Sequence, residues 1–395
     1  MGRKEDMAKA AQLLMAKQED VRNIGIVAHI DHGKCVSPET RLLFADGSIG
    51  TAQNIFDTYS KNGKLVKESA SETVYELQNE TTPIFSLNKQ TGKIEQKQIS
   101  HVWKLKGGKT LKVKLRNGAT VETTSKHKYL VFDGDFIEKQ AKDLQKGDFI
   151  INARELTTYS NINLKAELLN KISSKPLYVK LYSPITQTFK ELIQANPKLK
   201  ALLPSKAKDS ALTANIRNNR FPIVDALFLA QQSGINANTL YDNIEWIFYR
   251  VNGKYSKNAK PMHLPQNFEN FFYFVGLLLG DGHEDKLIVG KPLLGTRFAE
   301  ICQELGINPV FRNYSYRTPE ISAGSKTLMA ILESLFDYPL GKKSHKIRLS
   351  SFALSAPNSC LASLTRGYFD CDGTVEKARG AVSVSSTSVQ MLKDT

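Results

Sequence analysis

The sequence has few cysteines and no long apolar run. Its four cysteines are scattered and form no CxxC pair, which argues against a disulfide framework and against a structural zinc site. No apolar stretch reaches the length that a membrane-spanning helix needs, and the N-terminus has no signal-peptide core. We therefore expect a cytoplasmic chain with no membrane partner.

Acidic residues are also in deficit. The 395 residues include 54 Lys and Arg against 39 Asp and Glu, a formal net charge of +15. This balance points to a polyanionic partner such as nucleic acid, although a ribosome-associated or simply soluble protein also fits it. The length and the 41% of hydrophobic residues predict several domains with cores of their own.

The first 34 residues differ in character from the rest of the chain. Residues 5–17 predict an amphipathic helix, and residues 23–30 form a short apolar run typical of a buried parallel strand. Ala-His-Ile-Asp-His-Gly-Lys then makes a phosphate-binding loop without its final Mg²⁺-binding hydroxyl, in which backbone N–H groups and the lysine would contact phosphates. The alternative is a chance Gly-Lys turn. The nucleotide-binding candidates are His29, Asp31, His32, Gly33 and Lys34.

This opening resembles the start of archaeal elongation factor 2, a translocation GTPase, over residues 1–34. The resemblance implies GTP as a cofactor and the ribosome as a partner. Both apply only to the host protein, that is, the elongation factor after the sequence that interrupts its phosphate loop has been spliced out. The switch loops and guanine-reading motif of that family are missing after residue 34, and Cys35 stands where Ser or Thr would hold Mg²⁺. We expect no GTPase activity from this chain. A GTP-binding fragment with an unrelated insertion is an alternative that guanine-nucleotide binding would test.

An all-β unit is predicted for residues 35–155. Short β-type segments alternate there with Asp-Gly, Asn-Gly and Lys-Gly-Asp turn signals. Three places resemble an intein, a self-splicing Hint domain. Cys35 has the position of the N-terminal splicing nucleophile, residues 118–127 resemble the block that carries Thr-x-x-His, and residues 143–150 resemble the strand that comes after it.

The chemistry of splicing explains these residue types. Transfer of an acyl group from amide to thioester needs a thiol beside the peptide carbonyl, which Cys35 offers to Lys34. It also needs a proton donor for the departing amide nitrogen, for which His127 is the candidate, and Thr124 could hold the scissile unit. Singly, Cys35 could be a small buried residue and His127 a strand-edge histidine. An interrupted nucleotide loop favours splicing, because it is tolerable only if the insert is later removed.

Two copies of one nine-residue pattern occur at residues 274–282 and 365–373. Each predicts a helix that ends at an acidic residue followed by glycine. Small residues four positions apart would let the two helices approach closely. These small residues are Gly276, Gly280, Gly367 and Cys371. The alternative is a pair of ordinary core helices with Asp-Gly turns.

If these helices pack side by side, Asp281 and Asp372 meet at one end. Adjacent carboxylates raise one pKa unless a divalent cation neutralises them, which suggests metal-assisted phosphodiester hydrolysis. The pair resembles the LAGLIDADG (DOD) homing endonucleases nested in inteins. That resemblance implies Mg²⁺ bound by both aspartates and a double-stranded DNA target in the uninterrupted host gene. Residues 344–347 resemble the block that supplies a lysine near the attacking water, which makes Lys346 a candidate. Asp370 faces the helix body in this motif and is not assigned.

The residues in between predict a basic linker and a DNA-contacting subdomain. Residues 221–244 predict a helix, a turn at Gly234 and a second helix, the spacing of a helix-turn-helix, although such hairpins also occur without DNA. Base-contacting candidates are Asn236, Asn238 and Thr239. Phosphate-contacting candidates, which could also be a solvated basic face, are Arg217, Arg220, Lys254, Lys257 and Lys260.

We expect a multidomain fold: an all-β Hint domain with an inserted α+β LAGLIDADG endonuclease domain, preceded by a short helix-strand piece of a P-loop GTPase. The domains predicted are 1–34, 35–155, 156–265 and 266–395. No terminal His-Asn pair and no second host half precede Thr395. We therefore expect a C-terminally incomplete precursor that reaches the thioester but cannot complete splicing. The remaining alternative is a DNA-binding remnant whose splicing and nuclease sites are inactive.

Overall fold

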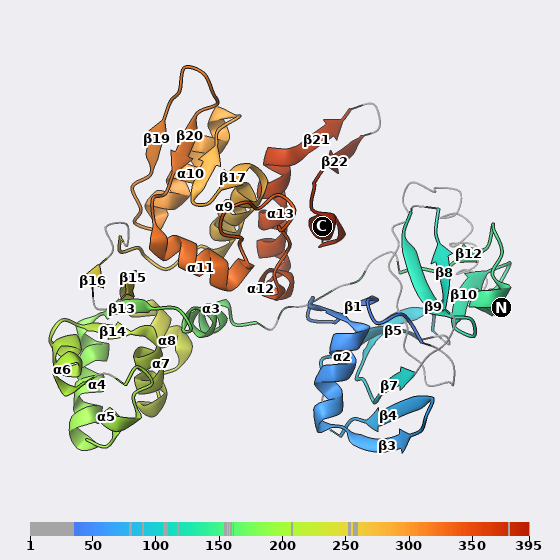
Figure 1. The fold of residues 1–395 in the computed structure, drawn as a ribbon, viewed down its shortest axis with the longest axis horizontal. Coiled ribbons are helices and arrows are strands. Elements are labelled where there is room, and N and C mark those ends of the chain that lie inside the picture. Colours follow the sequence, from blue (N-terminus) through green and yellow to red (C-terminus); the bar gives the residue numbers. More distant parts are fainter. Residues whose placement is uncertain are drawn as a thin grey trace. The chain divides into compact units, whose positions relative to one another are not determined.

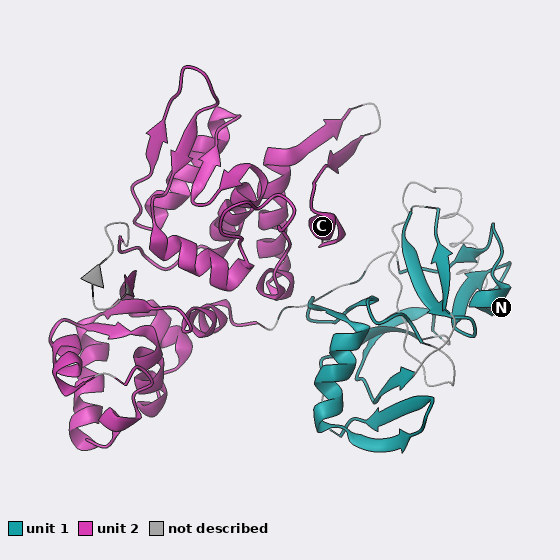
Figure 2. Ribbon diagram, in the orientation of Figure 1, with its two compact units in different colours: residues 1–160 teal, residues 161–395 magenta. Residues whose placement is uncertain are grey.

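The computed structural model describes residues 35–394 with short gaps at 79–80, 89–90, 106–109, 117, 154–155, 157, 159, 161, 207, 252–253, 256–259 and 378–379 (Figure 1). The chain divides into two compact units, unit 1 over residues 1–160 and unit 2 over residues 161–395 (Figure 2). The helix, strand and phosphate loop predicted before Cys35 lie outside the described residues. That applies to His29, Asp31, His32, Gly33 and Lys34.

In its described residues, unit 1 consists of small antiparallel sheets and the α-helix α2 (Ala52–Tyr59). Its strands are β1 (Arg41–Leu43), β2 (Ile49–Thr51), β3 (Lys64–Glu68), β4 (Glu72–Glu76), β5 (Ile84–Asn88), β6 (Lys93–Lys97), β7 (His101–Leu105), β8 (Thr110–Lys114), β9 (Thr120–Thr124), β10 (Lys128–Phe132), β11 (Phe136–Gln140) and β12 (Phe149–Ile150). β3-β4-β7 and β11-β10-β12 form three-stranded sheets, and the pairs are β1-β2, β5-β6 and β8-β9. Helix α2 (Ala52–Tyr59) starts at Thr51, whose side chain accepts the Asn54 N–H.

The turn signals of unit 1 lie where the chain reverses. Gly118, between β8 and β9, has a φ of +89°, and Gly134, between β10 and β11, has a φ of +76°. Only glycine adopts such angles at no steric cost, which confirms these two predicted turns. A small core forms under the sheets from Phe44, Ile55 and Val102.

The first part of unit 2 packs helices on a four-stranded sheet. Its elements are α3 (Leu164–Ile172), β13 (Leu177–Leu181), α4 (Ser183–Ala195), α5 (Leu199–Leu202), α6 (Asp209–Arg217), β14 (Arg220–Pro222), α7 (Ile223–Gln232), α8 (Ala237–Asp242), β15 (Ile244–Val251) and β16 (Lys254–Tyr255). The strand order is β14-β13-β15-β16. The predicted helix, turn and helix are confirmed as α7 and α8, joined at Gly234 with a φ of +70°.

The second part of unit 2 repeats one arrangement. The first copy is α9 (Phe268–Asp281), β17 (Gly282–His283), β18 (Lys286–Ile288), α10 (Pro292–Glu304), β19 (Val310–Arg312), β20 (Glu320–Ser322) and α11 (Lys326–Phe336). After α12 (Ser351–Ser355), the second copy starts with α13 (Asn358–Asp372), β21 (Gly373–Glu376), β22 (Ala381–Val384) and α14 (Val389–Asp394). The sheet of the first copy has the order β17-β18-β20-β19, and β21 pairs with β22.

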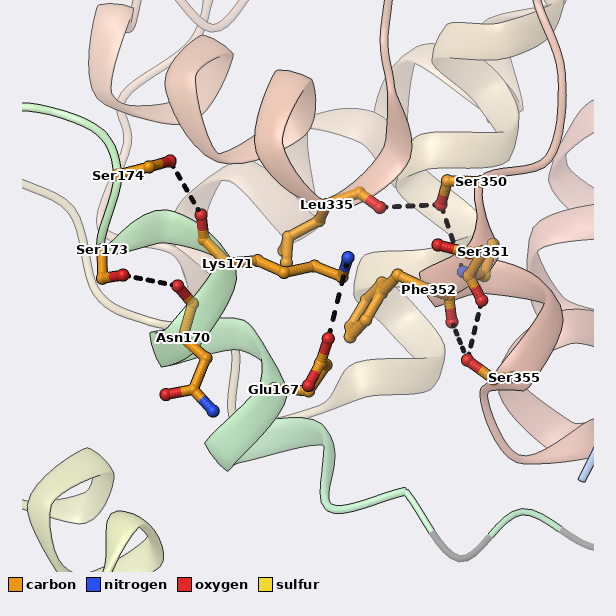
Figure 3. A network of polar contacts seen from close by, with 11 residues as sticks. Glu167, Asn170, Lys171, Ser173, Ser174, Leu335, Ser350, Ser351, Phe352 and Ser355 are labelled. Carbon is orange, nitrogen blue, oxygen red and sulfur yellow. Dashed lines mark hydrogen bonds and ion pairs between the residues drawn. The ribbon is translucent and has the colours of Figure 1, made fainter. Parts of the chain in front are cut away.

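One hydrophobic core joins both parts of unit 2. Helix α3 packs on α11, and within α3 the Lys171 ammonium forms an ion pair with Glu167 at 3.7 Å (Figure 3). The Thr327 hydroxyl donates to the Lys260 carbonyl at 3.0 Å and accepts the Tyr249 N–H at 3.1 Å. The segments predicted as separate domains, 156–265 and 266–395, therefore share one core. No helix of the described part of the chain is long and apolar enough to cross a bilayer.

Candidate functional site

Cys35 lies against the end of strand β9. The Thr124 N–H donates to the Cys35 carbonyl at 2.9 Å, and the Cys35 N–H donates to the Thr124 hydroxyl at 3.4 Å. Val36 next to it forms an antiparallel bridge with Thr123. Strand pairing thus brings together two predicted residues that are 89 positions apart in the sequence. The nitrogen held by Thr124 is the one through which Cys35 is bonded to the preceding residue.

His127 lies in the turn between β9 and β10 and is 1% exposed. Its N–H donates to the Thr124 carbonyl at 3.0 Å, and its carbonyl accepts the Ala141 N–H at 2.7 Å. The imidazole meets the ring of Tyr129 edge-on, with centroids 5.1 Å apart, and the Tyr129 hydroxyl donates to Thr123 at 3.2 Å. These contacts hold the imidazole in one place, three residues after the threonine that contacts Cys35.

The Cys35 thiol is partly buried in unit 1. Burial raises the pKa of this thiol, and the negative charge of Glu72 raises it further. Glu72 itself forms an ion pair with Lys67. Because only the thiolate attacks carbonyl carbon efficiently, a protonated Cys35 needs removal of its proton before or during attack.

The third intein-like segment closes a turn beside this site. Asp148 accepts the Gln145 N–H at 2.8 Å and the Lys139 ammonium at 2.7 Å. Both bonds hold the pKa of the Asp148 carboxyl below its ordinary value, the lysine bond being the larger cause. The next strand, β12, pairs with β10 at Val131 and Phe132. The segment therefore supports the strand that begins just after His127.

Helices α9 and α13 cross at glycine. A Cβ atom on Gly276 would overlap the Leu364 carbonyl oxygen and lie 2.8 Å from the Tyr368 nitrogen. One on Gly367 would overlap the Tyr273 carbonyl oxygen. Real Cβ atoms do not approach backbone atoms this closely, so any side chain here would force the helices apart. The predicted side-by-side packing of the two motif helices is confirmed.

The two motif aspartates end these helices. Asp281 closes α9 and Asp372 closes α13, and each is followed by a glycine that starts a β-hairpin. Burial raises the pKa of the Asp372 carboxyl, the charge of Asp281 raises it further, and the ammonium of Lys343 lowers it. The carboxylates are thus close enough to repel each other. Cys371, whose Cβ faces Gly280, has a thiol pKa raised to about 12, mainly by burial.

Lys343, rather than Lys346, is the lysine beside the aspartates. Its ammonium donates to three carbonyls at the end of α9, those of Leu278, Leu279 and Gly280, at 2.7, 2.7 and 2.5 Å. Burial lowers the pKa of Lys343 to about 8, against the raising effect of Asp372 and, more weakly, of Asp281. Lys346 is exposed, and its N–H donates to the Lys343 carbonyl. The signal for Lys343 was present in Gly-Lys-Lys-Ser-His-Lys, but spacing alone does not show which lysine turns inward.

Asp281 and Asp372 form a donor set that fits Mg²⁺. This ion takes one or two protein carboxylates together with water and substrate phosphates. Its charge would offset the burial and the repulsion from Asp281 that raise the pKa of Asp372. Within the described residues no group of three or more His, Cys, Asp or Glu side chains could hold a metal ion. Asp370 is turned elsewhere: it accepts the Tyr273 hydroxyl at 2.8 Å.

The predicted DNA-contacting residues of α7 and α8 are mostly on the surface. Asn236, Asn238 and Thr239 are exposed, although Asn236 also caps α8 by accepting the Thr239 N–H at 2.9 Å. Arg217 and Lys260 are exposed, and the guanidinium of Arg220 lies over the Phe248 ring at 5.9 Å. The side chains of Lys254 and Lys257 lie outside the described part of the chain.

Comparison with known proteins gives two family matches. Residues 58–304 match the intein splicing domain, and residues 359–395 match the LAGLIDADG-like domain. The first match includes Thr124, His127 and Asp281, and the second includes Asp372.

Similar proteins include an "Elongation factor 2" from Methanopyrus kandleri, 39% identical over the whole of this chain and 31% of the relative. A "Probable translation initiation factor IF-2" from Thermococcus kodakarensis is 25% identical over 94% of this chain and 30% of that protein. The chain thus spans about a third of the length of these relatives. The structure titled "Crystal structure of PabCDC21-1 intein" is 25% identical, with a TM-score of 0.27 over 30% of this chain and 71% of that one.

Proposed function

This chain belongs to the intein splicing domain family and carries a LAGLIDADG-like domain, and on that footing we propose that it starts protein splicing at Cys35. One observation carries the proposal: the reciprocal bonds between Cys35 and Thr124. They hold both the carbonyl and the nitrogen of Cys35, and so they fix the scissile nitrogen and the backbone from which the thiol extends. Orienting reactants in this way removes much of the entropic barrier to attack.

The first step is a transfer of the Lys34 acyl group from nitrogen to sulfur. The Cys35 sulfur bonds to the Lys34 carbonyl carbon and loses its proton, and the bond between that carbon and the Cys35 nitrogen breaks. The freed nitrogen gains one proton, which His127 donates. The thiol loses one proton in the same step, so the total number of protons is unchanged. Thr124 accepts a hydrogen bond from the scissile nitrogen and so directs it.

Hydroxylamine cleavage tests this step in the full chain. Hydroxylamine attacks thioesters, so incubation releases the peptide that ends at Lys34, and mass spectrometry detects it. Cys35→Ala abolishes the release, whereas Cys360→Ala, which removes a buried cysteine of unit 2, leaves it unchanged. Thr124→Val, which keeps the shape but loses the acceptor, slows it. If the wild-type chain stays as intact as Cys35→Ala, the splicing proposal is wrong.

We also propose a second activity, Mg²⁺-dependent hydrolysis of double-stranded DNA, because glycines at the crossing of α9 and α13 bring Asp281 and Asp372 to one end. These carboxylates would hold the Mg²⁺, which when bound supplies Lewis-acid polarisation of a phosphate. Lys343 would supply a cation beside the attacked phosphate, and its bonds to three carbonyls support this role by holding the end of α9. The target is the host gene without its insert.

Nicking of supercoiled plasmid carrying the uninterrupted host gene tests the nuclease. Asp281→Asn and Asp372→Asn abolish Mg²⁺-dependent nicking, and Asp370→Asn, which removes a carboxylate that faces Tyr273 instead, does not. A chain that binds DNA but nicks nothing, and in which these substitutions change nothing, is a DNA-binding remnant.

The similarity to elongation factor 2 supports a proposal for the host. After splicing, the loop that ends at Lys34 would regain its hydroxyl residue, bind GTP and serve translocation on the ribosome. GTP would bind only to the spliced host protein, which we place in the cytoplasm. A spliced product that binds no guanine nucleotide would refute this.

A further inference from the structure

Glu320, the first residue of β20, is a carboxylate surrounded by cations. Its exposed fraction is 5%. The Tyr314 hydroxyl donates to one carboxylate oxygen at 2.7 Å, and Arg312 donates to the same oxygen at 3.3 Å. Arg317 lies 3.8 Å from the other oxygen, and the ammonium of Lys286 lies 3.9 Å from the first. Three cations therefore converge on one anion, which leaves the cluster with a net positive charge.

The cluster occupies one face of the sheet β17-β18-β20-β19. Arg312 is paired directly with Glu320 across β19 and β20, so both side chains point to the same face. Leu287 and Ile321 alternate with the cluster residues along β18 and β20, point to the other face and are fully buried. Strand β17 of the same sheet directly follows Asp281. The cluster face thus continues from the end of α9, where the proposed nuclease residues lie.

The loop between β19 and β20 carries two tyrosine rings and one guanidinium group that lie close together. The Arg317 guanidinium lies 3.6 Å from the centre of the Tyr314 ring, and the Tyr316 ring lies 6.0 Å from that of Tyr314. Tyr316 is 81% exposed in relative terms, consistent with a place in the long loop at the end of the hairpin (Figure 1). Side chains of this kind contact bases and phosphates in nucleic-acid complexes.

A carboxylate at this position weakens the electrostatic attraction between this face and DNA. Each anion on such a face lowers the positive charge that neutralises phosphates, so affinity alone would favour a neutral residue. Glu320 instead restrains the side chains of Arg312 and Arg317 before DNA binds. Without this restraint, these long side chains would lose more rotamer entropy when they bind DNA. A restrained guanidinium can meet the edge of one base pair and not of another, because its donors form a rigid fork.

We propose that Glu320 is a positioning residue that holds Arg312 and Arg317 for base contacts, and so raises discrimination between DNA sequences at some cost in affinity. The proposal rests on the proposed DNA-directed function of the same domain. The partner is double-stranded DNA, whose base edges the two arginines would contact in a groove. Glu320 and Tyr314 would hold these arginines in position.

The test compares binding of the full chain to two duplexes without Mg²⁺, so that cleavage plays no part. One duplex is recovered from a randomised library by the wild-type chain, and the other is a scrambled sequence of equal composition. Glu320→Gln, which keeps the shape but loses the charge, lowers the ratio of the two affinities about tenfold or more. Its affinity for the scrambled duplex stays the same or rises. Glu333→Gln removes the same charge from an ion pair with Lys175 and leaves the ratio unchanged.

Tyr314→Phe keeps the test decisive if Glu320→Gln fails to fold. It removes one hydroxyl that donates to Glu320, and it lowers the ratio less than the charge change does. A folded Glu320→Gln or Tyr314→Phe with the wild-type ratio overturns the inference, as does a parallel loss of affinity for both duplexes. A wild-type chain that recovers no sequence from the library removes the DNA function, and the inference with it. Retained recovery with an unchanged ratio removes the inference alone.

Discussion

Alanine at Gly276 tests the crossing on which the proposed nuclease site depends. The added Cβ would overlap the Leu364 carbonyl oxygen, lie 2.8 Å from the Tyr368 nitrogen and lie 3.0 Å from the Cα of Gly367. All three atoms belong to the backbone of α13, so no side-chain rotation relieves the overlap. The helices must separate instead, by about 1 Å, in a core packed as densely as a crystal.

The expected cost follows from this geometry. Overpacking a dense core costs about 1–3 kcal/mol, and a clash with rigid backbone belongs at the upper end. Alanine gains about 1 kcal/mol over glycine in helix propensity, which offsets part of it. We therefore expect Gly276→Ala to lower the free energy of unfolding by about 2 kcal/mol or more. Gly280→Ala meets the Cβ of Cys371 at 2.5 Å, an atom that no rotamer change moves, so it is destabilising as well. Gly290→Ala, at a position with open space around it, changes stability by less than about 0.5 kcal/mol.

Tryptophan fluorescence during urea unfolding measures these differences. Trp103 and Trp246 are the two tryptophans of the chain, one in each unit, so a Trp103→Phe background reports unit 2 alone. DNA nicking in the same variants follows the separation of Asp281 from Asp372, and a displacement of about 1 Å lowers it about a hundredfold. Gly276→Ala with the stability and activity of Gly290→Ala would refute the close crossing.

Three further predictions concern single side chains. Lys343→Met lowers DNA nicking about a hundredfold while Lys346→Met leaves it nearly unchanged, because only the former ammonium lies beside the aspartates; equal losses in plasmid nicking would contradict this. Glu72→Gln removes a charge that raises the pKa of the Cys35 thiol, so the pH midpoint of hydroxylamine release moves down; a midpoint that stays or rises counts against it. Asn236→Ala removes the cap of α8 and lowers the unfolding free energy of unit 2 by about 1 kcal/mol in urea, and no change would show that the cap is not used.

Local sequence patterns predicted much of the framework. The Asp-Gly pairs mark the ends of α9 and α13, and the glycines at 118 and 134 mark two hairpins of unit 1. Each of these features depends on a few neighbouring residues. Gly118 and Gly134 adopt positive φ, and a Cβ on Gly282 or Gly373 would overlap a carbonyl oxygen of the preceding helical turn. The small-residue spacing in the two motifs predicted their contact as well, since a close helix crossing leaves a regular mark along the chain.

Other features depend on elements that only the fold brings together. The cations around Glu320 come from β18, β19 and the loop before β20, and no local pattern indicates that they converge on one carboxylate. Likewise, the sequence predicts the segment 156–265 as a separate domain. In the structure, Thr327 of α11 hydrogen-bonds to both Tyr249 and Lys260, and the segment shares one hydrophobic core with the rest of unit 2. Contacts between strands and helices distant in the sequence depend on packing, which pattern alone does not encode.

The sequence by itself predicted Cys35 as the nucleophile and Asp281 and Asp372 as a pair, and it indicated the two families, because these residues stand in motifs whose spacing is local. Tertiary structure decided which lysine lies beside Asp372, how Thr124 contacts the backbone nitrogen of Cys35, and where a charge such as Glu320 is buried. The physical reason is one of range. Backbone conformation depends on neighbours along the chain, whereas burial, pKa and hydrogen bonding depend on neighbours in space.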